Sequence, residues 1–206
     1  MADSEAKVHV VNRALVKIGE PASFTIDANT ALGGKIDLVW PGVEARVYAT
    51  YDWADARQTF SLEAISGATG LGWSYGFLLP ATRIGQPLAI LTDVVRECYL
   101  RDFMIEGGKI YTNVTPVWAR CRVAADPETW DEGFKEAFAI ALASALAVPL
   151  TQDEQMRDTL AAQAFGDPRE QGGGGLFGKL SQIDRAAQPQ GRGFMDNDPL
   201  TAARFG

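Results

Sequence analysis

The spacing of apolar residues predicts two helices in the first 60 residues of the chain. Close to the start, apolar residues recur every three or four positions, the period of an amphipathic helix, at Val8, Val11, Leu15 and Ile18. Gly19 follows, where a left-handed residue often ends a helix. A longer helix is expected from about Leu32 into residues 51–57. Pro41 either begins its main segment or kinks it, because proline lacks a backbone donor.

A third helix is expected shortly after residue 125. Asp126 occupies an N-cap position, Pro127 suits the first helical position, and acidic residues follow near the positive end of the helix dipole. Its core-facing stripe contains Trp130, Phe134, Ala137, Phe138, Ala141, Leu142, Ala145 and Leu146. Pro149 is expected to end this helix, and the capping box Thr151–Glu154 to begin a last helix that reaches about Phe165. Two helices joined so closely are expected to form an antiparallel pair.

Between these helical regions the pattern is that of extended chain. The runs 99–106 and 109–114 are joined by Gly107-Gly108, a two-residue turn that suits a β-hairpin. A third run, 117–123, alternates small apolar residues with Trp118, Arg120 and Arg122, so one face is apolar and the other cationic. We therefore predict a small antiparallel sheet over residues 86–124.

The character of the sequence changes again after Asp167. The glycine run 172–175 leads into a polar segment that buries too little apolar surface to offset its chain entropy, so residues 169–206 are predicted to be a flexible arm. Within it, a short amphipathic turn is possible at Leu176, Phe177, Leu180 and Ile183. Further apolar anchors follow at Phe194, Met195, Leu200 and Phe205, with Arg204 as an ionic one. The alternative is an irregular C-terminus without a role.

Together these patterns predict a mainly α, α+β protein. Helices in 1–62 and 126–168 form a bundle, residues 63–125 form an antiparallel β insertion, and 169–206 form an extended C-terminal arm. A length of 206 residues with 47% apolar residues is enough for one domain with a sizeable core. The start of the chain lacks the pattern of a secretory signal, and the longest nearly uninterrupted apolar stretch, 138–150, is 13 residues, so no membrane span is expected.

The net charge of −7 is concentrated in one region. Residues 126–170 contain ten acids and three bases, and the rest of the chain is neutral. A protein that binds nucleic-acid phosphates needs an excess of basic residues over acidic ones. Two interpretations remain open: a solvated helix face, or the negatively charged wall of a channel past which DNA slides.

The sequence does not assemble a catalytic, metal or cofactor site. Its single histidine, His9, falls inside the first predicted helix, where it is expected to be a surface or half-buried residue. Cys98 and Cys121 are expected to be buried free thiols, and there is no Cys-x-x-Cys or histidine pair. The glycines at 70, 72 and 76 miss the dinucleotide spacing. We therefore expect no enzyme activity and no cofactor.

One group of residues suits a protein interface. Trp118 lies on the polar face of its predicted strand beside Arg120 and Arg122, and Trp and Arg are enriched at the centres of protein interfaces. These three residues are the candidate subunit or tail interface.

Several short phrases resemble the head-to-tail adaptor proteins of tailed phages, in particular the tail tubular protein A family. The resemblance covers about residues 8–165. In order, the phrases are Asn12–Glu20, Trp40-Pro41 to Trp53, Phe77–Pro80, Ile105–Asn113, Pro127–Phe134 and Ala147–Thr151. It implies a helical bundle with a small β insertion. It also implies a structural virion protein that forms a ring, commonly of twelve subunits, through which DNA passes.

The resemblance further implies the partners and the place of assembly. The ring would lie beneath the portal protein, receive the tail or nozzle protein on its other side, and assemble in the host cytoplasm. The C-terminal segment would reach the portal, which makes Phe194, Met195, Leu200, Arg204 and Phe205 the candidate portal-docking residues. The residues do not encode the tail type. The alternative function is a soluble enzyme or ligand-binding domain whose site is not recognisable from sequence.

Overall fold

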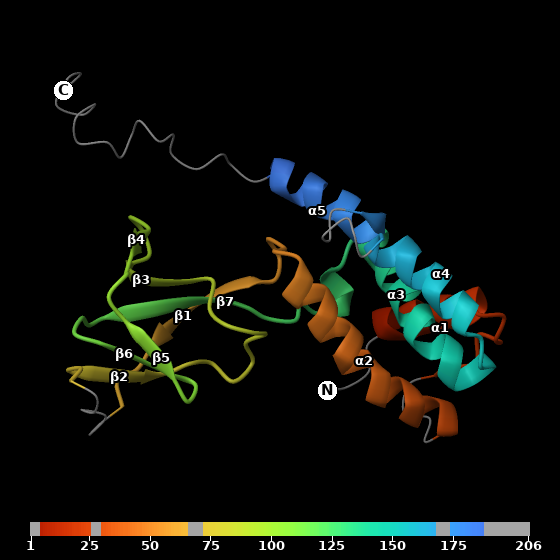
Figure 1. Cartoon of the computed structure of the whole chain (residues 1–206), viewed down its shortest axis with the longest axis horizontal. Helices are drawn as coiled ribbons and strands as arrows, with labels where there is room; N and C mark the ends of the chain where they lie inside the picture. The colour runs from red at the N-terminus through yellow and green to blue at the C-terminus, as the bar shows by residue number, and fades with distance from the viewer. Residues whose placement is uncertain (1–4, 26–29, 66–71, 168–173, 188–206) are drawn as a thin grey trace.

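The computed structural model describes residues 5–25, 30–65, 72–167 and 174–187. These residues form five α-helices and two small antiparallel β-sheets (Figure 1). The helices gather at one end of an elongated molecule and the strands at the other. We call these parts the helical bundle (α1 to α5) and the β unit (described residues 57–122). The fold is α+β, as the sequence predicts.

The bundle contains two helices before the β unit and three after it. Their bounds are α1 (Glu5–Lys17), α2 (Ala31–Thr50), α3 (Glu132–Thr151), α4 (Glu154–Phe165) and α5 (Gly175–Ala187). The hydroxyl of Thr30 caps α2 by accepting a hydrogen bond from the Gly33 amide at 3.0 Å. Pro41 lies inside α2, so it does not begin that helix.

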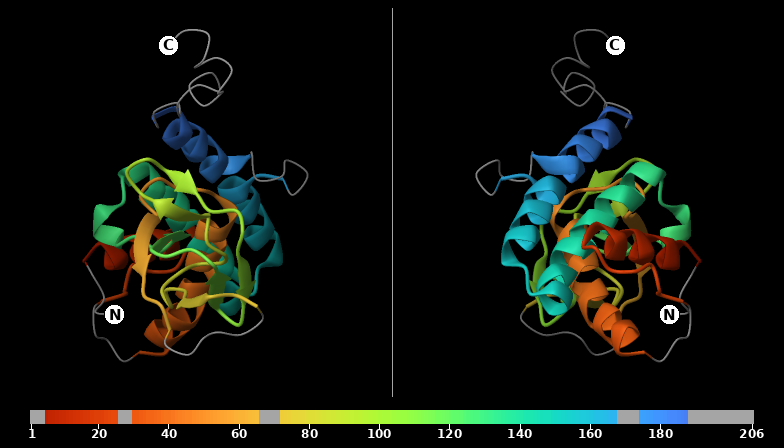
Figure 2. Two further views of the ribbon diagram at one scale, coloured as in Figure 1. Left: turned by 90° about the vertical axis from the view of Figure 1, so that its left-hand side faces the viewer. Right: turned by 90° about the vertical axis from the view of Figure 1, so that its right-hand side faces the viewer.

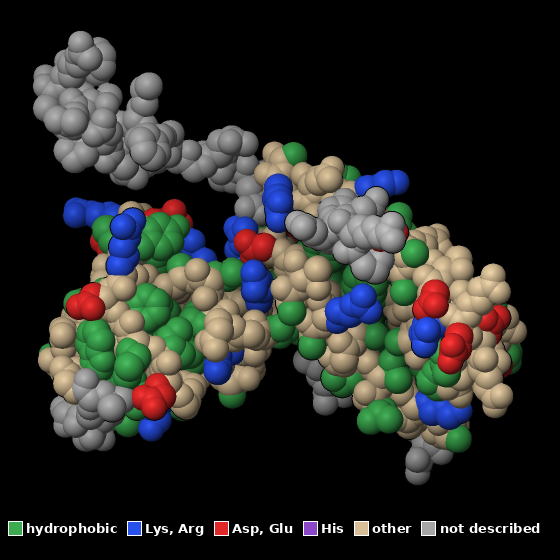
Figure 3. Space-filling view, in the orientation of Figure 1, with side chains coloured by type: hydrophobic (Ala, Val, Ile, Leu, Met, Phe, Trp, Pro, Cys, Tyr) green, Lys and Arg blue, Asp and Glu red, His purple; other side chains and the backbone are tan. Residues whose placement is uncertain are grey.

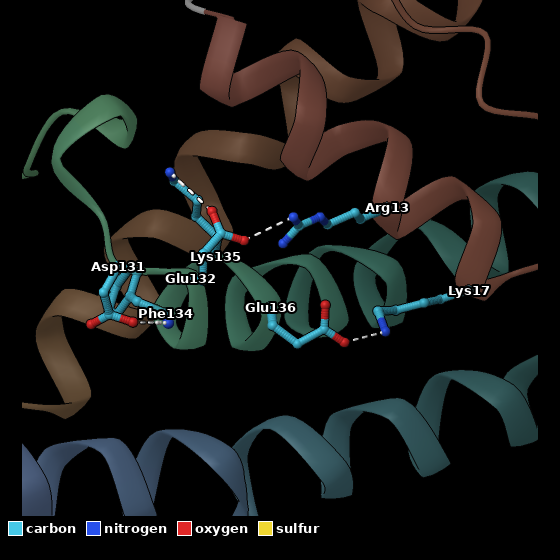
Figure 4. Close-up of polar contacts among 7 residues, drawn as sticks. All are labelled: Arg13, Lys17, Asp131, Glu132, Phe134, Lys135 and Glu136. Atoms are coloured by element: carbon cyan, nitrogen blue, oxygen red, sulfur yellow. Dashed lines mark hydrogen bonds and ion pairs between the residues drawn. The ribbon is translucent and has the colours of Figure 1, made fainter.

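The start of α3 differs from the sequence prediction. Asp126 caps only a short 3-10 turn, Pro127–Thr129, and the chain is extended again at Trp130. The residue that caps α3 is Asp131, whose Oδ1 accepts from the Phe134 amide at 2.7 Å (Figure 4). Two successive aspartates each fit an N-cap position, and tertiary packing decides which of them begins the long helix.

The end of α3 and the start of α4 each lie about two residues later than the sequence predicts. Pro149 lies within the last turn of α3, which continues to Thr151. Gln152 then adopts a left-handed conformation with φ 58°, and Asp153, not Thr151, caps α4. Aspartate is at least as good an N-cap as threonine, so the capping-box pattern pointed to the right turn but to the wrong residue.

The centre of the bundle is α3, which packs against α1, α2, α4 and α5. Its predicted stripe is buried except for the half-buried Ala145, and Trp130 stacks on Trp40 with ring centroids 6.0 Å apart. Buried alanines allow the neighbouring helices to come close: Ala137, Ala139, Ala141, Ala143 and Ala147. Within the described residues, α3 is also the one helix whose length and composition would allow it to cross a membrane. However, 61% of that stretch is buried in the bundle.

The β unit contains two sheets, where the sequence predicted one. The strands are β1 (Arg57–Leu62), β2 (Tyr75–Leu78), β3 (Ala89–Asp93), β4 (Cys98–Tyr99), β5 (Met104–Glu106), β6 (Lys109–Thr112) and β7 (Val117–Arg122). One sheet has the order β1-β7-β3-β4 and the other β2-β6-β5. The expected run 99–106 is interrupted, so β4 and β5 belong to different sheets. The predicted hairpin forms between β5 and β6, with positive φ at both Gly107 and Gly108.

The segment expected to be a short turn in a flexible arm is instead a 13-residue helix, α5, that packs on α3 and α4 (Figures 1 and 2). Its Phe177 is completely buried. The Phe177 ring contacts the aromatic rings of Tyr51, Trp53, Phe134 and Phe165. The prediction of a flexible arm is therefore wrong for residues 175–187. The polar composition of the segment led to that prediction, although its one aromatic residue, Phe177, is enough to anchor the helix to the bundle.

Candidate interaction surface on the four-stranded sheet

The predicted alternation along β7 is confirmed. Val117, Ala119 and Cys121 are buried in a second hydrophobic core inside the β unit. Trp118 and Arg120 are half-buried on the opposite face. On that face Trp118 lies opposite Ser61 of β1 and Leu91 of β3. Because β7 is a central strand, its polar face occupies the middle of the sheet.

The arginines of this face are paired within the chain. Arg120 donates to Glu97 Oε1 at 2.9 Å, from the turn between β3 and β4. Arg122 Nε lies 3.8 Å from Asp52 Oδ1, and Arg57 donates twice to the same carboxylate, at 2.7 and 3.1 Å. The face that the sequence marked as cationic is thus largely neutralised, and Trp118 remains its main feature for a partner.

A shallow hollow of about 620 Å³ lies beside Trp118. Its other walls come from Thr59 and Ser61 of β1 and from residues 92–95 of β3 and the following turn. The Asp93 carboxylate holds this turn by accepting from the amides of Val95 and Arg96, at 2.9 and 3.1 Å. The hollow is therefore walled on one side by a turn of fixed shape.

The turn between β3 and β4 exposes apolar side chains that the sequence analysis missed. Val95 is 93% exposed and Val94 is also exposed, and Tyr99 of the adjoining strand β4 is 58% exposed. Figure 3 shows apolar side chains distributed over this side of the β unit. The signal in the sequence was a Val-Val pair between Asp93 and Arg96, where a turn would normally be polar. We call Trp118, Val94, Val95 and Tyr99 the apolar rim of the sheet.

Most of the acids in residues 126–170 have structural roles that account for their positions. Asp126, Asp131 and Asp153 cap helical segments, and Glu128 accepts from the Ala6 amide at the start of α1, at 3.0 Å. Two more bind cations of α1 (Figure 4): Glu132 accepts from Arg13 at 2.8 Å and Glu136 from Lys17 at 2.6 Å. The acidic excess of α3 therefore includes charges that fasten α1 to the bundle. This supports the solvated helix face, with capping, as the origin of the acidic composition.

The remaining predicted site residues lie partly outside the described structure. Phe194, Met195, Leu200, Arg204 and Phe205 fall in residues 188–206 and are outside the described residues. His9 is exposed on α1. Cys98 and Cys121 are free thiols, as expected, but Cys98 is exposed, since β4 is a short edge strand. Burial raises the pKa of the Cys121 thiol. Among the described residues, no group of three or more His, Cys, Asp or Glu side chains could hold a metal ion.

Asp52 is expected to make the stability of the β unit's junction dependent on pH. Hydrogen bonds from Arg57 are the main cause that lowers the pKa of Asp52, and the charges of Arg57 and Arg122 add to it, against the opposing effect of partial burial. A carboxyl with a depressed folded-state pKa contributes stability above its unfolded pKa of about 3.9 and loses it as the pH falls through the folded value. We expect Asp52→Asn to lower the free energy of unfolding by on the order of 1 kcal/mol at neutral pH. The difference from the wild type should vanish in strong acid.

Urea unfolding at neutral pH and in acid measures this effect, with Asp55→Asn as the control. Asp55 is an exposed aspartate three residues away that has no ion pair or side-chain hydrogen bond within the described residues. A loss of stability for Asp52→Asn that stays constant with pH would contradict the assignment.

Comparisons of the chain with protein-family models and with curated proteins found no match.

Proposed function

We propose that this protein is a structural head-to-tail adaptor of a tailed phage, which forms a ring between the portal and the tail and lets DNA pass through its lumen. One observation supports the proposal most strongly. The fold that the resemblance to the adaptor family implies agrees with the fold in which the resembling sequence segments lie. The resemblance implies a helical bundle with a small β insertion, and the described residues form such a bundle and such an insertion.

The phrases lie at junctions that determine this fold. In the first phrase, the Asn12 side chain and the backbone of Phe24 exchange two hydrogen bonds of 3.0 Å, which folds the chain back along α1. Gly19 ends that segment with φ 81°. In the segment Pro127–Phe134, the rings of Trp130 and Phe134 pack on each other with centroids 4.9 Å apart. These roles support a shared fold. The adaptor role itself is our inference from the order of the phrases.

The surface of the β unit suits a protein partner better than a small substrate. Three residues of the apolar rim, Val94, Val95 and Trp118, line a shallow hollow, whereas small-molecule sites are deep and enclose most of their ligand. Exposed apolar residues of this kind commonly mark interaction sites. In the proposed ring, the apolar rim would contact the neighbouring subunit or the tail protein.

Co-assembly with the portal protein of the same phage tests the proposal. Electron microscopy and native mass spectrometry of the mixture should show a ring of adaptor subunits on the portal. A mixture in which the two proteins remain separate, at concentrations where the portal itself is intact, would overturn the proposal. A chain that ends at residue 187 keeps every described element and tests separately whether residues 188–206 are needed for docking.

A substitution in the apolar rim should weaken this assembly. Val95→Glu places a charge on the most exposed apolar side chain of the rim, and we expect fewer complete rings at equal protein concentration. Arg96→Glu is the matched control, since it adds a carboxylate one residue later on the same turn but removes no apolar surface. Equal yields of rings for both variants and the wild type would exclude the rim from the subunit and tail interfaces.

A further inference from the structure

The last turns of α5 lie at one end of the four-stranded sheet. The Asp184 carboxylate accepts from the Ala54 amide at 3.1 Å, in the segment just before β1. Asp184 also lies close enough to Arg57, the first residue of β1, for their charges to interact. Figure 1 shows that the C-terminal end of α5 is the end nearer to the β unit. The chain therefore leaves α5 beside the start of β1.

This end of the sheet leads directly to the hollow beside Trp118. Side chains alternate along a strand, so Arg57, Thr59 and Ser61 share one face of β1. Thr59 and Ser61 line the hollow, and Ser61 pairs with Trp118 on the neighbouring strand. At about 3.3 Å per residue, Ser61 lies only about 13 Å from Arg57. The chain that follows α5 thus begins close to the hollow and on the same face of the sheet.

The residues that follow α5 have the length to reach this hollow. Residues 188–193 contain only Gln, Pro, Gly and Arg, and the first large apolar side chains after Ala187 are those of Phe194 and Met195. The chain from Ala187 to Phe194 spans up to about 23 Å when it is extended. This span exceeds the distance along β1 to the hollow, so the polar residues 188–193 suffice as a spacer.

The apolar pair also matches the surface that the hollow presents. Trp118 is only half-buried, and Val94 and Val95 are exposed on the adjoining turn. Aromatic rings pack favourably on one another, and a methionine sulfur makes favourable contacts with aromatic rings. The Trp118 ring can therefore contact both Phe194 and Met195, and the two valines can pack against them. These side chains of the hollow are accessible without any rearrangement of the core.

Charge complementarity favours the same placement. Asp196 and Asp198 follow the apolar pair in the sequence. The turn beside the hollow carries Arg96, whose side chain is 84% exposed and whose ion pair with Asp93 is long, at 4.0 Å. Its guanidinium is therefore open to a second carboxylate. An exposed pair of this kind contributes little affinity, but it favours one orientation of the segment over others.

We propose that Phe194 and Met195 occupy the hollow beside Trp118 in their own chain. Their docking removes apolar side chains of the rim from water, and the chain entropy lost by residues 188–195 opposes this gain. The contact therefore adds little to the stability of the fold, and a stronger partner can displace the segment. In the ring proposed above, the neighbouring subunit or the tail protein would replace it. The contact in the free chain does not depend on that ring.

Methyl NMR spectra of the full chain test the proposal, because Val94 and Val95 provide probes in the wall of the hollow. We expect nuclear Overhauser contacts between the Phe194 ring and the methyl groups of Val95. We also expect ring-current shifts of the Val94 and Val95 methyl signals. Absence of both the contacts and the shifts would overturn the proposal.

Two double variants of the full chain locate the contact. Phe194→Ser with Met195→Ser should abolish the contacts to Val95 and move its methyl signals. Leu200→Ser with Phe205→Ser is the matched control, since it removes two apolar side chains further along the same segment. It should leave the Val95 signals unchanged. Equal effects of the two double variants on the Val95 signals would contradict the assignment to residues 194–195.

Dilution shows which chain supplies the segment. A segment of the same chain has a fixed effective concentration, so the shifts of Val94 and Val95 should not change with protein concentration. Shifts that disappear on dilution would mean that a second copy supplies the segment, which would overturn the proposal. The measurement uses the isolated chain, so its failure is distinct from a failure to assemble with a portal.

Discussion

Replacement of Phe177 by alanine is expected to lower the free energy of unfolding by about 3–5 kcal/mol, because it empties the position that attaches α5 to the bundle. The Phe177 ring is fully buried among four other aromatic rings, at centroid distances of 5.3 to 6.1 Å. Its removal creates a cavity that these large rings cannot easily fill. Urea unfolding followed by tryptophan fluorescence measures the loss, since Trp53 is one of the contacting residues.

Ile183→Ala is the matched control on the same helix. Ile183 is 66% exposed, so its truncation should change the free energy of unfolding by less than about 1 kcal/mol. Truncated chains extend the comparison: a chain ending at residue 187 should melt like the full protein, and one ending at residue 167 should be destabilised like Phe177→Ala. Similar stability for the two truncated chains would mean that α5 does not contribute to the core.

Gly175→Ala is expected to have the second-largest effect, because the chain can dock α5 only with glycine at this position. The backbone of Gly175 has φ 66°, and a Cβ there would clash with the backbone nitrogen of Gly166 and lie 2.6 Å from the Ala164 oxygen. A left-handed conformation alone costs a non-glycine residue on the order of 1–3 kcal/mol, and the backbone clash adds to this. Thermal unfolding should show a clearly lower melting temperature.

The same substitution elsewhere in the bundle should have the opposite sign. Gly34 lies in α2 and a Cβ at this position meets no atom within 4 Å. Gly34→Ala should therefore stabilise the protein by about 0.5–1 kcal/mol, the usual advantage of alanine inside a helix. If Gly175→Ala were neutral or stabilising like Gly34→Ala, the start of α5 could not lie against Gly166 as described.

The elements that the sequence predicted correctly are those with strong local signals. The apolar period of α1 and α3 and the glycine pair at 107–108 each determine local structure with little help from the rest of the chain. The second sheet was missed because β2 has only four residues and follows a glycine-rich stretch without a clear alternation. Its partner β6 is adjacent in space and distant in sequence.

The candidate sites were less predictable, since they depend on contacts between distant residues. The alternation along β7 correctly placed Trp118, Arg120 and Arg122 on one face. It could not show that Glu97 and Asp52 neutralise the two arginines, because those acids come from a turn and from the chain before β1. The hollow beside Trp118 draws its lining from β1, β3, β7 and the turn after β3, which no local pattern brings together.

The central position of α3 has a consequence for how the chain folds during synthesis. Both α1 and α2 pack on α3, which the ribosome makes only after the whole β unit. The β unit is closed by its own first and last strands, which pair from Arg57↔Arg122 to Leu62↔Val117. The β unit can therefore complete its pairing while the N-terminal helices still lack their partner. Its closure also brings the end of α2 near the point where α3 will begin, which shortens the loop that the bundle must close.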